Sequence, residues 1–130
     1  MKKYYLFLGF AVAAFSFGCK KGPGEGGQTS IIGKVWEQKF FGSIHNTDTL
    51  DHWATEQDIY IIYGSELSYG NRTKAGPEGL YEFQYLRAGD YTVYFYSDST
   101  LNLKKVIKRV VKIPDSGRVD LGTDTIKKIF

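Results

Sequence analysis

Cysteine is nearly absent from this chain of 130 residues, which contains only Cys19. A single thiol excludes an internal disulfide, so the stability of a folded domain has to come from its hydrophobic core. The chain also lacks a Gly-x-Ser-x-Gly sequence and a glycine-rich phosphate-binding loop, which are signatures of common hydrolases and nucleotide-binding proteins. We therefore expect no enzyme activity, no cofactor and no bound metal.

Most of the chain has no excess of either positive or negative charge. The formal net charge is +3, but Lys2, Lys3, Lys20 and Lys21 all lie near the N-terminus. From Gln28 onward the chain has 13 basic and 13 acidic residues. A nucleic-acid partner requires a basic excess gathered on one face, so we expect no nucleic acid among the partners.

No uncharged run is long enough to span a bilayer. Residues 4–17 carry no charge, but these fourteen residues are fewer than the roughly 20 that a transmembrane helix needs. After the basic start Met1-Lys2-Lys3, a run of this length is typical of a signal-peptide core. The run is followed by Gly18 and Cys19, and a cysteine directly after a small residue resembles the cleavage box of bacterial lipoproteins.

The resemblance implies that residues 1–18 are a lipoprotein signal peptide and that Cys19 becomes the acylated N-terminus, carrying palmitate-type chains. Position 16 is Ser where Leu is commoner in such boxes, and an ordinary cleaved signal or a core helix is the alternative. Two or more acyl chains anchor a protein durably, because each buried CH₂ contributes about 0.8 kcal/mol. We expect a lipid anchor in the outer membrane of a Gram-negative cell envelope, with the periplasmic and surface faces both open.

Residues 19–29 lack the side chains of a core. Residues 20–28 contain four glycines and one proline in nine positions. Such a composition predicts a flexible tether that holds the domain off the membrane.

Aromatic residues are abundant and favour strands. They form 16% of the chain, with 10 Tyr and 9 Phe. Short β-prone runs alternate with glycine turns, and no helical pattern is visible. Residues 30–130 are therefore predicted to be one all-β domain, an Ig-like or prealbumin-like antiparallel β-sandwich of about seven strands. The expected strands are residues 30–37, 58–63, 72–74, 81–85, 91–96, 104–113, 119–121 and 124–129.

The segment 76–97 carries a resemblance to a known family. A glycine turn, an aromatic-x-Phe strand, Leu-x-x-Gly and Tyr-Thr-Val together resemble the carboxypeptidase regulatory-like domain family, within the prealbumin-like and Cna protein B-type sandwiches. The resemblance covers about residues 30–128 and implies an accessory, binding or spacer module. The matching residues are Gly33, Val35, Gly79, Tyr81, Phe83, Leu86, Gly89, Tyr91 and Val93.

Two activities of related sandwiches have little support here. Transthyretin-like hydrolases have a Tyr-Arg-Gly-Ser tail, whereas residues 126–130 read Ile-Lys-Lys-Ile-Phe. Some Cna protein B-type domains link a first-strand Lys to a last-strand Asn through a Glu. The nearest candidates are Lys34, Glu82 and Asp124, and the last strand has no Asn.

Gly89 and Tyr91 are predicted to form a structural corner. A tyrosine after a glycine corner can return its hydroxyl to the backbone a few residues upstream and so fix the crossover between sheets. Plain packing of the Tyr91 ring in the core is the alternative.

The segment 39–56 has the least regular pattern and is a candidate functional loop. It contains His45, Asp48, Asp51 and His52 within eight residues. Zinc sites need three or four ligands in tight geometry, and this spacing matches no ligand motif. We interpret these residues as solvated.

Surplus aromatic rings are the better indication of binding. Tyr94 and Tyr96 share the face opposite Tyr91, Val93 and Phe95. Tyrosine and tryptophan are favoured at interfaces, and planar rings can stack on sugars or peptides. The alternative is that these rings are covered or half-buried. The candidate ligand contacts are Trp53, Tyr69, Tyr94 and Tyr96.

The sequence supports two functions of different kinds. The first is a non-catalytic binding or accessory module for a protein or a glycan. The second is a structural spacer or assembly component that pairs through a sheet edge, for which the Lys-rich segment 104–113 is the expected edge strand.

Overall fold

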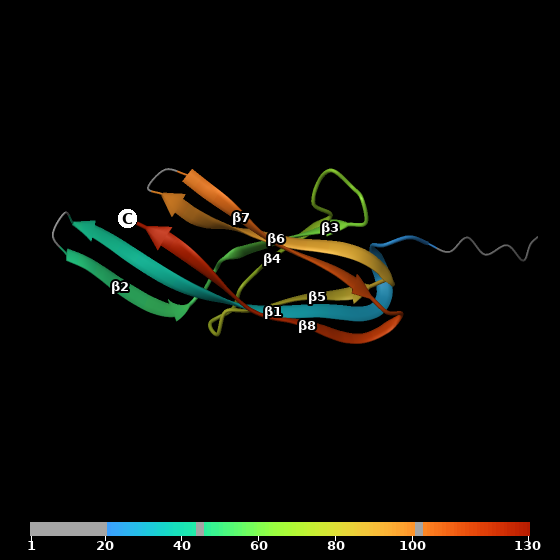
Figure 1. The fold of residues 1–130 in the computed structure, drawn as a ribbon. Helices are drawn as coiled ribbons and strands as arrows, with labels where there is room; N and C mark the ends of the chain where they lie inside the picture. Colours follow the sequence, from blue (N-terminus) through green and yellow to red (C-terminus); the bar gives the residue numbers. More distant parts are fainter. Residues whose placement is uncertain (1–20, 44–45, 101–102) are drawn as a thin grey trace, which may run out of the picture.

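A computed structural model describes residues 21–43, 46–100 and 103–130 of the chain. These residues form eight strands and no helix, and the strands make two sheets that face each other (Figure 1). The predicted all-β sandwich is therefore confirmed. The strands are β1 (Glu25–Ser43), β2 (Asn46–Trp53), β3 (Asp58–Tyr63), β4 (Asn71–Lys74), β5 (Leu80–Leu86), β6 (Gly89–Thr100), β7 (Leu103–Ile113) and β8 (Ser116–Ile129).

The long strand β1 is the centre of the first sheet, sheet A. One edge of β1 pairs with β8, and its other edge pairs first with β5 and then with β2. The pairs with β5 and β2 are antiparallel, but β1 and β8 are parallel, with Gln28 opposite Ser116. The expectation of a wholly antiparallel sandwich is wrong for this pair, because β7 delivers the chain to the end of the sandwich where β1 begins.

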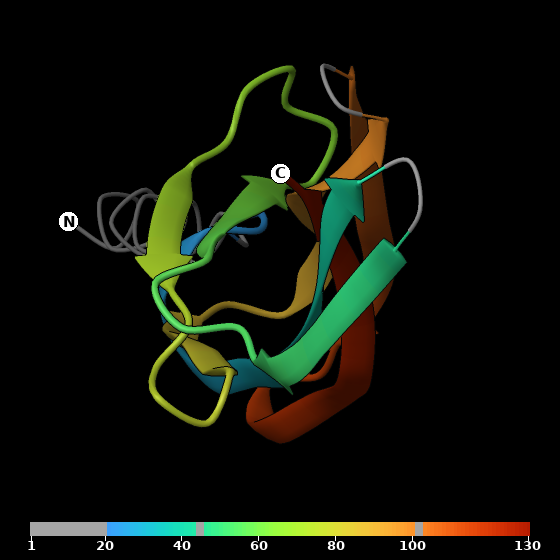
Figure 2. The ribbon, with the colours of Figure 1, turned by 90° about the vertical axis from the view of Figure 1, so that its left-hand side faces the viewer.

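Sheet B has the strand order β4-β3-β6-β7, and all its pairs are antiparallel. Strand β7 borders this sheet, as the Lys-rich sequence predicts. The β1–β2 and β6–β7 hairpins lie at the same end of the molecule, opposite the N-terminal segment. Figure 2 looks along the sandwich from that hairpin end.

The core lies between the sheets and is built from alternate residues of each strand. Strand β3 contributes Ile59 and Ile61, and β6 contributes Tyr91, Val93 and Phe95, all at most 1% exposed. This period of two is the pattern that the sequence of both strands predicts. The other large core side chains are Ile31, Val35, Tyr81, Phe83, Leu86, Ile113 and Ile126.

Strand β5 departs from the expected alternation near its end. Tyr81 and Phe83 are buried, but Tyr85 is 69% exposed and has a φ of 58°. Leu86 is buried instead, and the register with β1 is irregular there, with both Glu25 and Thr29 opposite Leu86. A bulge in the pairing therefore turns Tyr85 outward.

The predicted loop at residues 39–56 is for the most part a hairpin. Strand β1 continues to Ser43, and β2 begins at Asn46. The extension of β1 pairs with β8 as far as Phe40, and the ring of Phe41 stacks on Phe130 with centroids 5.4 Å apart. These distant contacts stabilise a segment whose own sequence has no strand pattern.

The end of the chain is one strand rather than the two short strands expected at residues 119–121 and 124–129. Gly122 interrupts the pattern with a φ of 76°, and its N–H donates to Asp120 Oδ1 at 2.8 Å. The register with β1 shifts at this point. The apparent break is thus a bulge within β8.

The predicted tether at residues 19–29 is wrong for residues 22–29. Strand β1 begins at Glu25, and the segment before it is fixed to the sandwich. The N–H of Gly24 donates to the hydroxyl of Tyr91 at 2.8 Å, and Nε of Arg87 donates to Gly22 O at 2.7 Å. The predicted signal peptide and the lipidation site at Cys19 lie outside the described residues.

Candidate functional site

Four tyrosine rings gather on the outer face of sheet B. Tyr60 lies on β3, Tyr94 and Tyr96 lie on β6, and Tyr69 lies in the loop between β3 and β4. Tyr60 and Tyr94 are cross-strand partners. We call the surface formed by these four residues the tyrosine face. It includes three of the four residues that the sequence nominates as ligand contacts.

The rings form one contiguous cluster. Tyr60 stacks on Tyr94 with centroids 5.0 Å apart and an interplanar angle of 15°. Tyr69 meets Tyr60 edge to face at 5.0 Å, and Tyr96 meets Tyr94 edge to face at 5.9 Å. Tyr69 and Tyr96 are the open members, at 49% and 41% exposed. The inner pair is therefore held in place by the two rings that face solvent.

Tyr60 was not predicted as part of this face. The run of residues 58–63 is nearly all apolar, and such a run indicates a strand that is buried on both sides. In the structure only Ile59 and Ile61 are fully buried, while Tyr60 and Ile62 point outward. The sequence offers one signal for this position. In a strand, successive side chains point to opposite faces, so Tyr60 lies on the face opposite Ile59 and Ile61.

A shallow hollow of about 180 Å³ lies beside the tyrosines, on the side of β7. Two valines of β7 add apolar surface here, since Val106 is 48% and Val110 is 74% exposed. A hollow of this size suits a single apolar side chain or part of a sugar ring. Its lining residues are Ile62, Thr92, Tyr94, Val106 and Lys108.

Cations flank the tyrosine face on both sides. Arg72 of β4 is the cross-strand partner of Tyr60, and Lys108 of β7 is the partner of Tyr94. Within the described part of the chain, neither cation takes part in an ion pair. Both remain able to contact an anionic group of a bound molecule.

The hydroxyl of Tyr94 stays protonated well above neutral pH. Burial raises its pKa, and the neighbouring hydroxyls of Tyr96, Tyr60 and Tyr69 raise it further. A neutral phenol both donates and accepts a hydrogen bond. The tyrosine face can therefore offer stacking surface, hydrogen bonds and positive charge at one place.

Trp53 does not join this surface. It lies on β2 in sheet A, where its ring meets Trp36 edge to face at 4.9 Å. The ammonium of Lys34 lies 5.0 Å from the centroid of the Trp53 ring. The ring is half-buried by these contacts, and we assign it a structural role in the β1–β2 pair.

A second cluster surrounds Glu37, which the sequence did not single out. Its carboxylate is only 2% exposed and lies 2.9 Å from Lys128, 3.3 Å from His52 and 3.5 Å from Lys39. The Nδ1–H of His52 donates to the carbonyl of Trp53 at 2.7 Å, so the ring lies between this carbonyl and the Glu37 carboxylate. This cluster connects β1, β2 and β8 at the base of the hairpin and is explained by that structural role.

The residues considered for a metal are only partly described. His45 and the side chain of Asp48 lie outside the described part of the chain, Asp51 accepts a bond from Gln38 at 3.4 Å, and His52 belongs to the Glu37 cluster. Among residues whose placement is known, no three His, Cys, Asp or Glu side chains are grouped to hold a metal ion.

The three candidates for a cross-link have separate partners. Lys34 lies over the Trp53 ring, Glu82 pairs with Arg118 at 3.7 Å, and Asp124 binds Arg109. The arrangement gives no support to a Lys–Glu–Asp cross-link.

No protein-family model matches the sequence, and no curated protein is significantly similar to it. The carboxypeptidase regulatory-like resemblance therefore stays a prediction. None of the residues that the structure describes belongs to a helix long and apolar enough to cross a membrane.

Proposed function

We propose that this protein is a lipid-anchored lipoprotein of the Gram-negative outer membrane whose β-sandwich is a non-catalytic binding module for a protein or a glycan. The observation that supports the binding role is the tyrosine face. Tyr96 on β6 and Tyr69 in the β3–β4 loop are large exposed rings over the outer face of sheet B, which also carries the exposed Val106 and Val110. Contiguous apolar surface of this kind marks interaction sites in soluble domains.

The composition of the face fits recognition rather than catalysis. Tyrosine and arginine are enriched among the residues that contribute most to binding, because a rigid ring buries a large area and keeps a polar tip. Arg72 and Lys108 favour a partner that carries acidic groups, since opposite charges across an interface speed association and orient the partner. The lipid anchor is supported by the signal-like residues 1–18 and by Cys19.

The alternative function is a structural component of the envelope that pairs through a sheet edge. Strand β7 favours it, since its eleven residues border sheet B. If the β7 strands of two copies paired, Lys104, Lys108 and Lys112 of one copy would lie close to the lysines of the other. Repulsion between these like charges disfavours self-pairing through β7. An equilibrium mass of a monomer that does not change with protein concentration would argue against assembly through this edge.

The binding role is tested by photocrosslinking in living cells. A photoreactive phenylalanine analogue replaces Tyr96, and in a matched variant it replaces Tyr85, which is equally an exposed tyrosine but lies on sheet A. We expect a discrete crosslinked species, protein or polysaccharide, only from position 96. Equal crosslinking from positions 96 and 85 would contradict a specific role for the tyrosine face.

The same face is tested in solution with a panel of purified envelope glycans. The double substitution Tyr94→Ala, Tyr96→Ala is compared with the unaltered protein for glycan binding and for free energy of unfolding. We expect the double variant to lose binding to any glycan of the panel that the unaltered protein binds. Unchanged binding in a double variant of unchanged stability would count strongly against this face.

The anchor is tested by Cys19→Ala with protease treatment of intact cells. We expect the substitution to move the protein from the membrane to the soluble fraction. Cleavage on intact cells would assign the domain to the outer surface, and cleavage only after permeabilisation would assign it to the periplasm. If Cys19→Ala leaves the membrane fraction unchanged, the lipoprotein assignment fails.

A further inference from the structure

The N-terminal segment is packed against one end of the sandwich. Pro23 lies between Gly64, directly after β3, and Gly89, the first residue of β6: a Cβ on Gly89 would be 2.5 Å from Pro23 Cγ, and one on Gly64 would be 3.5 Å from it. Gly24 is buried and bonded to Tyr91. The chain therefore leaves the folded domain at residue 22, beside the ends of β3 and β6.

The connection from this point to the proposed anchor is short. Gly22 lies three positions after Cys19, with Lys20 and Lys21 between them, and a fully extended chain spans at most about 3.6 Å per position, or about 11 Å here. An acylated Cys19 sits at the membrane surface. This end of the sandwich is consequently held close to the bilayer.

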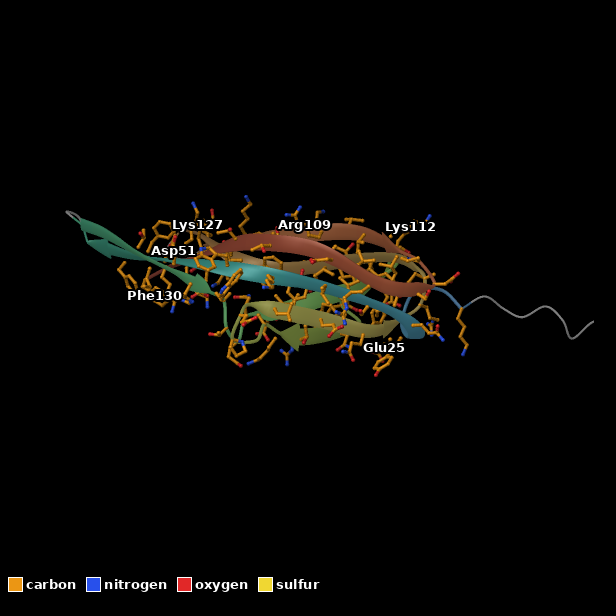
Figure 3. All side chains as sticks on the ribbon, turned by 90° about the horizontal axis from the view of Figure 1, so that it is seen from below. Glu25, Asp51, Arg109, Lys112, Lys127 and Phe130 are labelled. Carbon is orange, nitrogen blue, oxygen red and sulfur yellow. The ribbon has the colours of Figure 1, made fainter. Side chains whose placement is uncertain are left out.

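The β3–β4 loop lies at the same end. The residues on either side of the loop both bind Glu25, since the hydroxyl of Tyr63 donates to Glu25 Oε1 at 3.2 Å and Nδ2 of Asn71 donates to it at 2.9 Å. Figure 1 shows the loop on the half of the molecule that carries the N-terminal segment. In Figure 3, Glu25 lies near that segment, whereas Asp51 and Phe130 lie toward the hairpins.

The loop presents a fully exposed apolar side chain. Leu67 is three residues from Gly64 and makes no contact that shields it from solvent. An apolar side chain beside a lipid anchor can enter the headgroup region.

We infer that the β3–β4 loop rests on the bilayer that holds the lipid of Cys19, with Leu67 in the headgroup region and the β1–β2 and β6–β7 hairpins directed away from the membrane. The inference rests on the proposed anchor and adds an orientation to it. It leaves Tyr94 and Tyr96 on the side of the domain, accessible to a partner in the envelope.

The experiment compares two exposed leucines at opposite ends of the molecule. Leu67→Cys and Leu50→Cys are each labelled with an environment-sensitive fluorophore in the full acylated protein, in which the thiol of Cys19 is blocked. Leu50 is 54% exposed and lies on β2. The proteins are placed in phosphatidylethanolamine–phosphatidylglycerol vesicles that contain lipids with a nitroxide quencher near the headgroup, and the lipid on Cys19 is verified by mass.

We expect several-fold greater quenching at position 67 than at position 50. Equal quenching at both positions, or greater quenching at position 50, overturns the orientation while the lipid anchor stands. A mass without lipid on Cys19 overturns the anchor and the orientation together. Both leucines are on the surface, so neither substitution removes a core contact.

Discussion

The guanidinium of Arg109 on β7 donates hydrogen bonds to the carboxylate of Asp124 on β8. The pair connects the edge strand of sheet B to the last strand of sheet A. Arg109 Nε lies 3.0 Å from Asp124 Oδ1 and 3.1 Å from Oδ2, and its terminal nitrogen binds Oδ1 as well. Asp124 is 6% exposed, whereas the side chain of Arg109 is half exposed. The pair closes one side of the sandwich, where no backbone pairing connects β7 to β8.

Arg109→Gln should destabilise the domain by about 2 kcal/mol, because it leaves the buried Asp124 carboxylate without its charged donor. The measurement is the urea midpoint of unfolding. Lys108→Gln is the matched control, since Lys108 is the adjacent exposed cation and forms no ion pair among the described residues. An equal midpoint for the two variants would contradict a role for the Arg109–Asp124 pair in stability.

Tyr91→Phe should lower the free energy of unfolding by about 1–3 kcal/mol and loosen the N-terminal segment. The hydroxyl of Tyr91 donates to Arg87 O at 2.6 Å, the corner geometry that the sequence predicts, and accepts the bond from Gly24. Without it the buried N–H of Gly24 loses its acceptor. We expect faster amide hydrogen exchange at Gly24 in Tyr91→Phe than in the control variant Tyr85→Phe. Unchanged exchange at Gly24 would contradict a role of the Tyr91 hydroxyl in holding the N-terminal segment.

Alkaline titration should reveal tyrosines that ionise late. Burial raises the pKa of Tyr63 from 10.0 to about 12, and the nearby negative charge of Glu25 adds to the effect. Burial also raises the pKa of Tyr91. A folded-state pKa above the unfolded value contributes stability that is present below pH 10 and is lost as the pH rises toward 12.

The measurement for Tyr63 is the absorbance of tyrosinate as the pH is raised. We expect a late step near pH 12 that Tyr63→Phe reduces. In urea all tyrosines should ionise together near pH 10. Ionisation of every tyrosine near pH 10 in the folded protein would contradict the environment described for Tyr63.

Asp98 should make the domain sensitive to acid. Burial opposes its charge, but the hydrogen bonds from Lys104 and from the N–H of Ile129, with the charges of Lys104 and Lys128, outweigh burial and lower the pKa. A lowered folded-state pKa contributes stability that is present above the ordinary pKa and is lost as the pH falls through the folded value.

Asp98→Asn should therefore reduce stability at neutral pH and flatten its loss in acid. The measurement is the urea midpoint at a series of acidic pH values. Asp115→Asn is the control, because Asp115 is an exposed carboxylate in the turn before β8. Parallel acid curves for the unaltered protein and for Asp98→Asn would show that the contacts of Asp98 do not stabilise the fold.

Local patterns in the sequence predict the strands that have one buried face. Ile59, Ile61, Val93 and Phe95 follow the period of two, and Gly79 in the glycine turn has a positive φ of 69°. Where the contacts are between distant segments, local patterns fail. The parallel pairing of β1 with β8 joins residues almost ninety positions apart and has no signal in either strand.

The candidate site shows the same division. Tyr94 and Tyr96 alternate with core residues, so their outward position follows from the strand period. The approach of Tyr69 and Tyr60 depends on the fold of the β3–β4 loop. The glycine-rich start of the domain has the composition of a linker, and it is ordered because Arg87 and Tyr91, more than sixty residues away, bind its backbone.

Strand β1 runs from the segment beside the proposed anchor to the far hairpin, and it is paired along both edges for most of its length. A force applied along the axis of β1 acts on its hydrogen bonds to β8, β5 and β2 in shear. Because the force is shared among these bonds, they resist it together rather than breaking one after another. The domain is therefore suited to carry tension between its two ends. Tension between the proposed anchor and a partner bound near the hairpins would pass through β1, which pairs with three other strands in the described part of the chain.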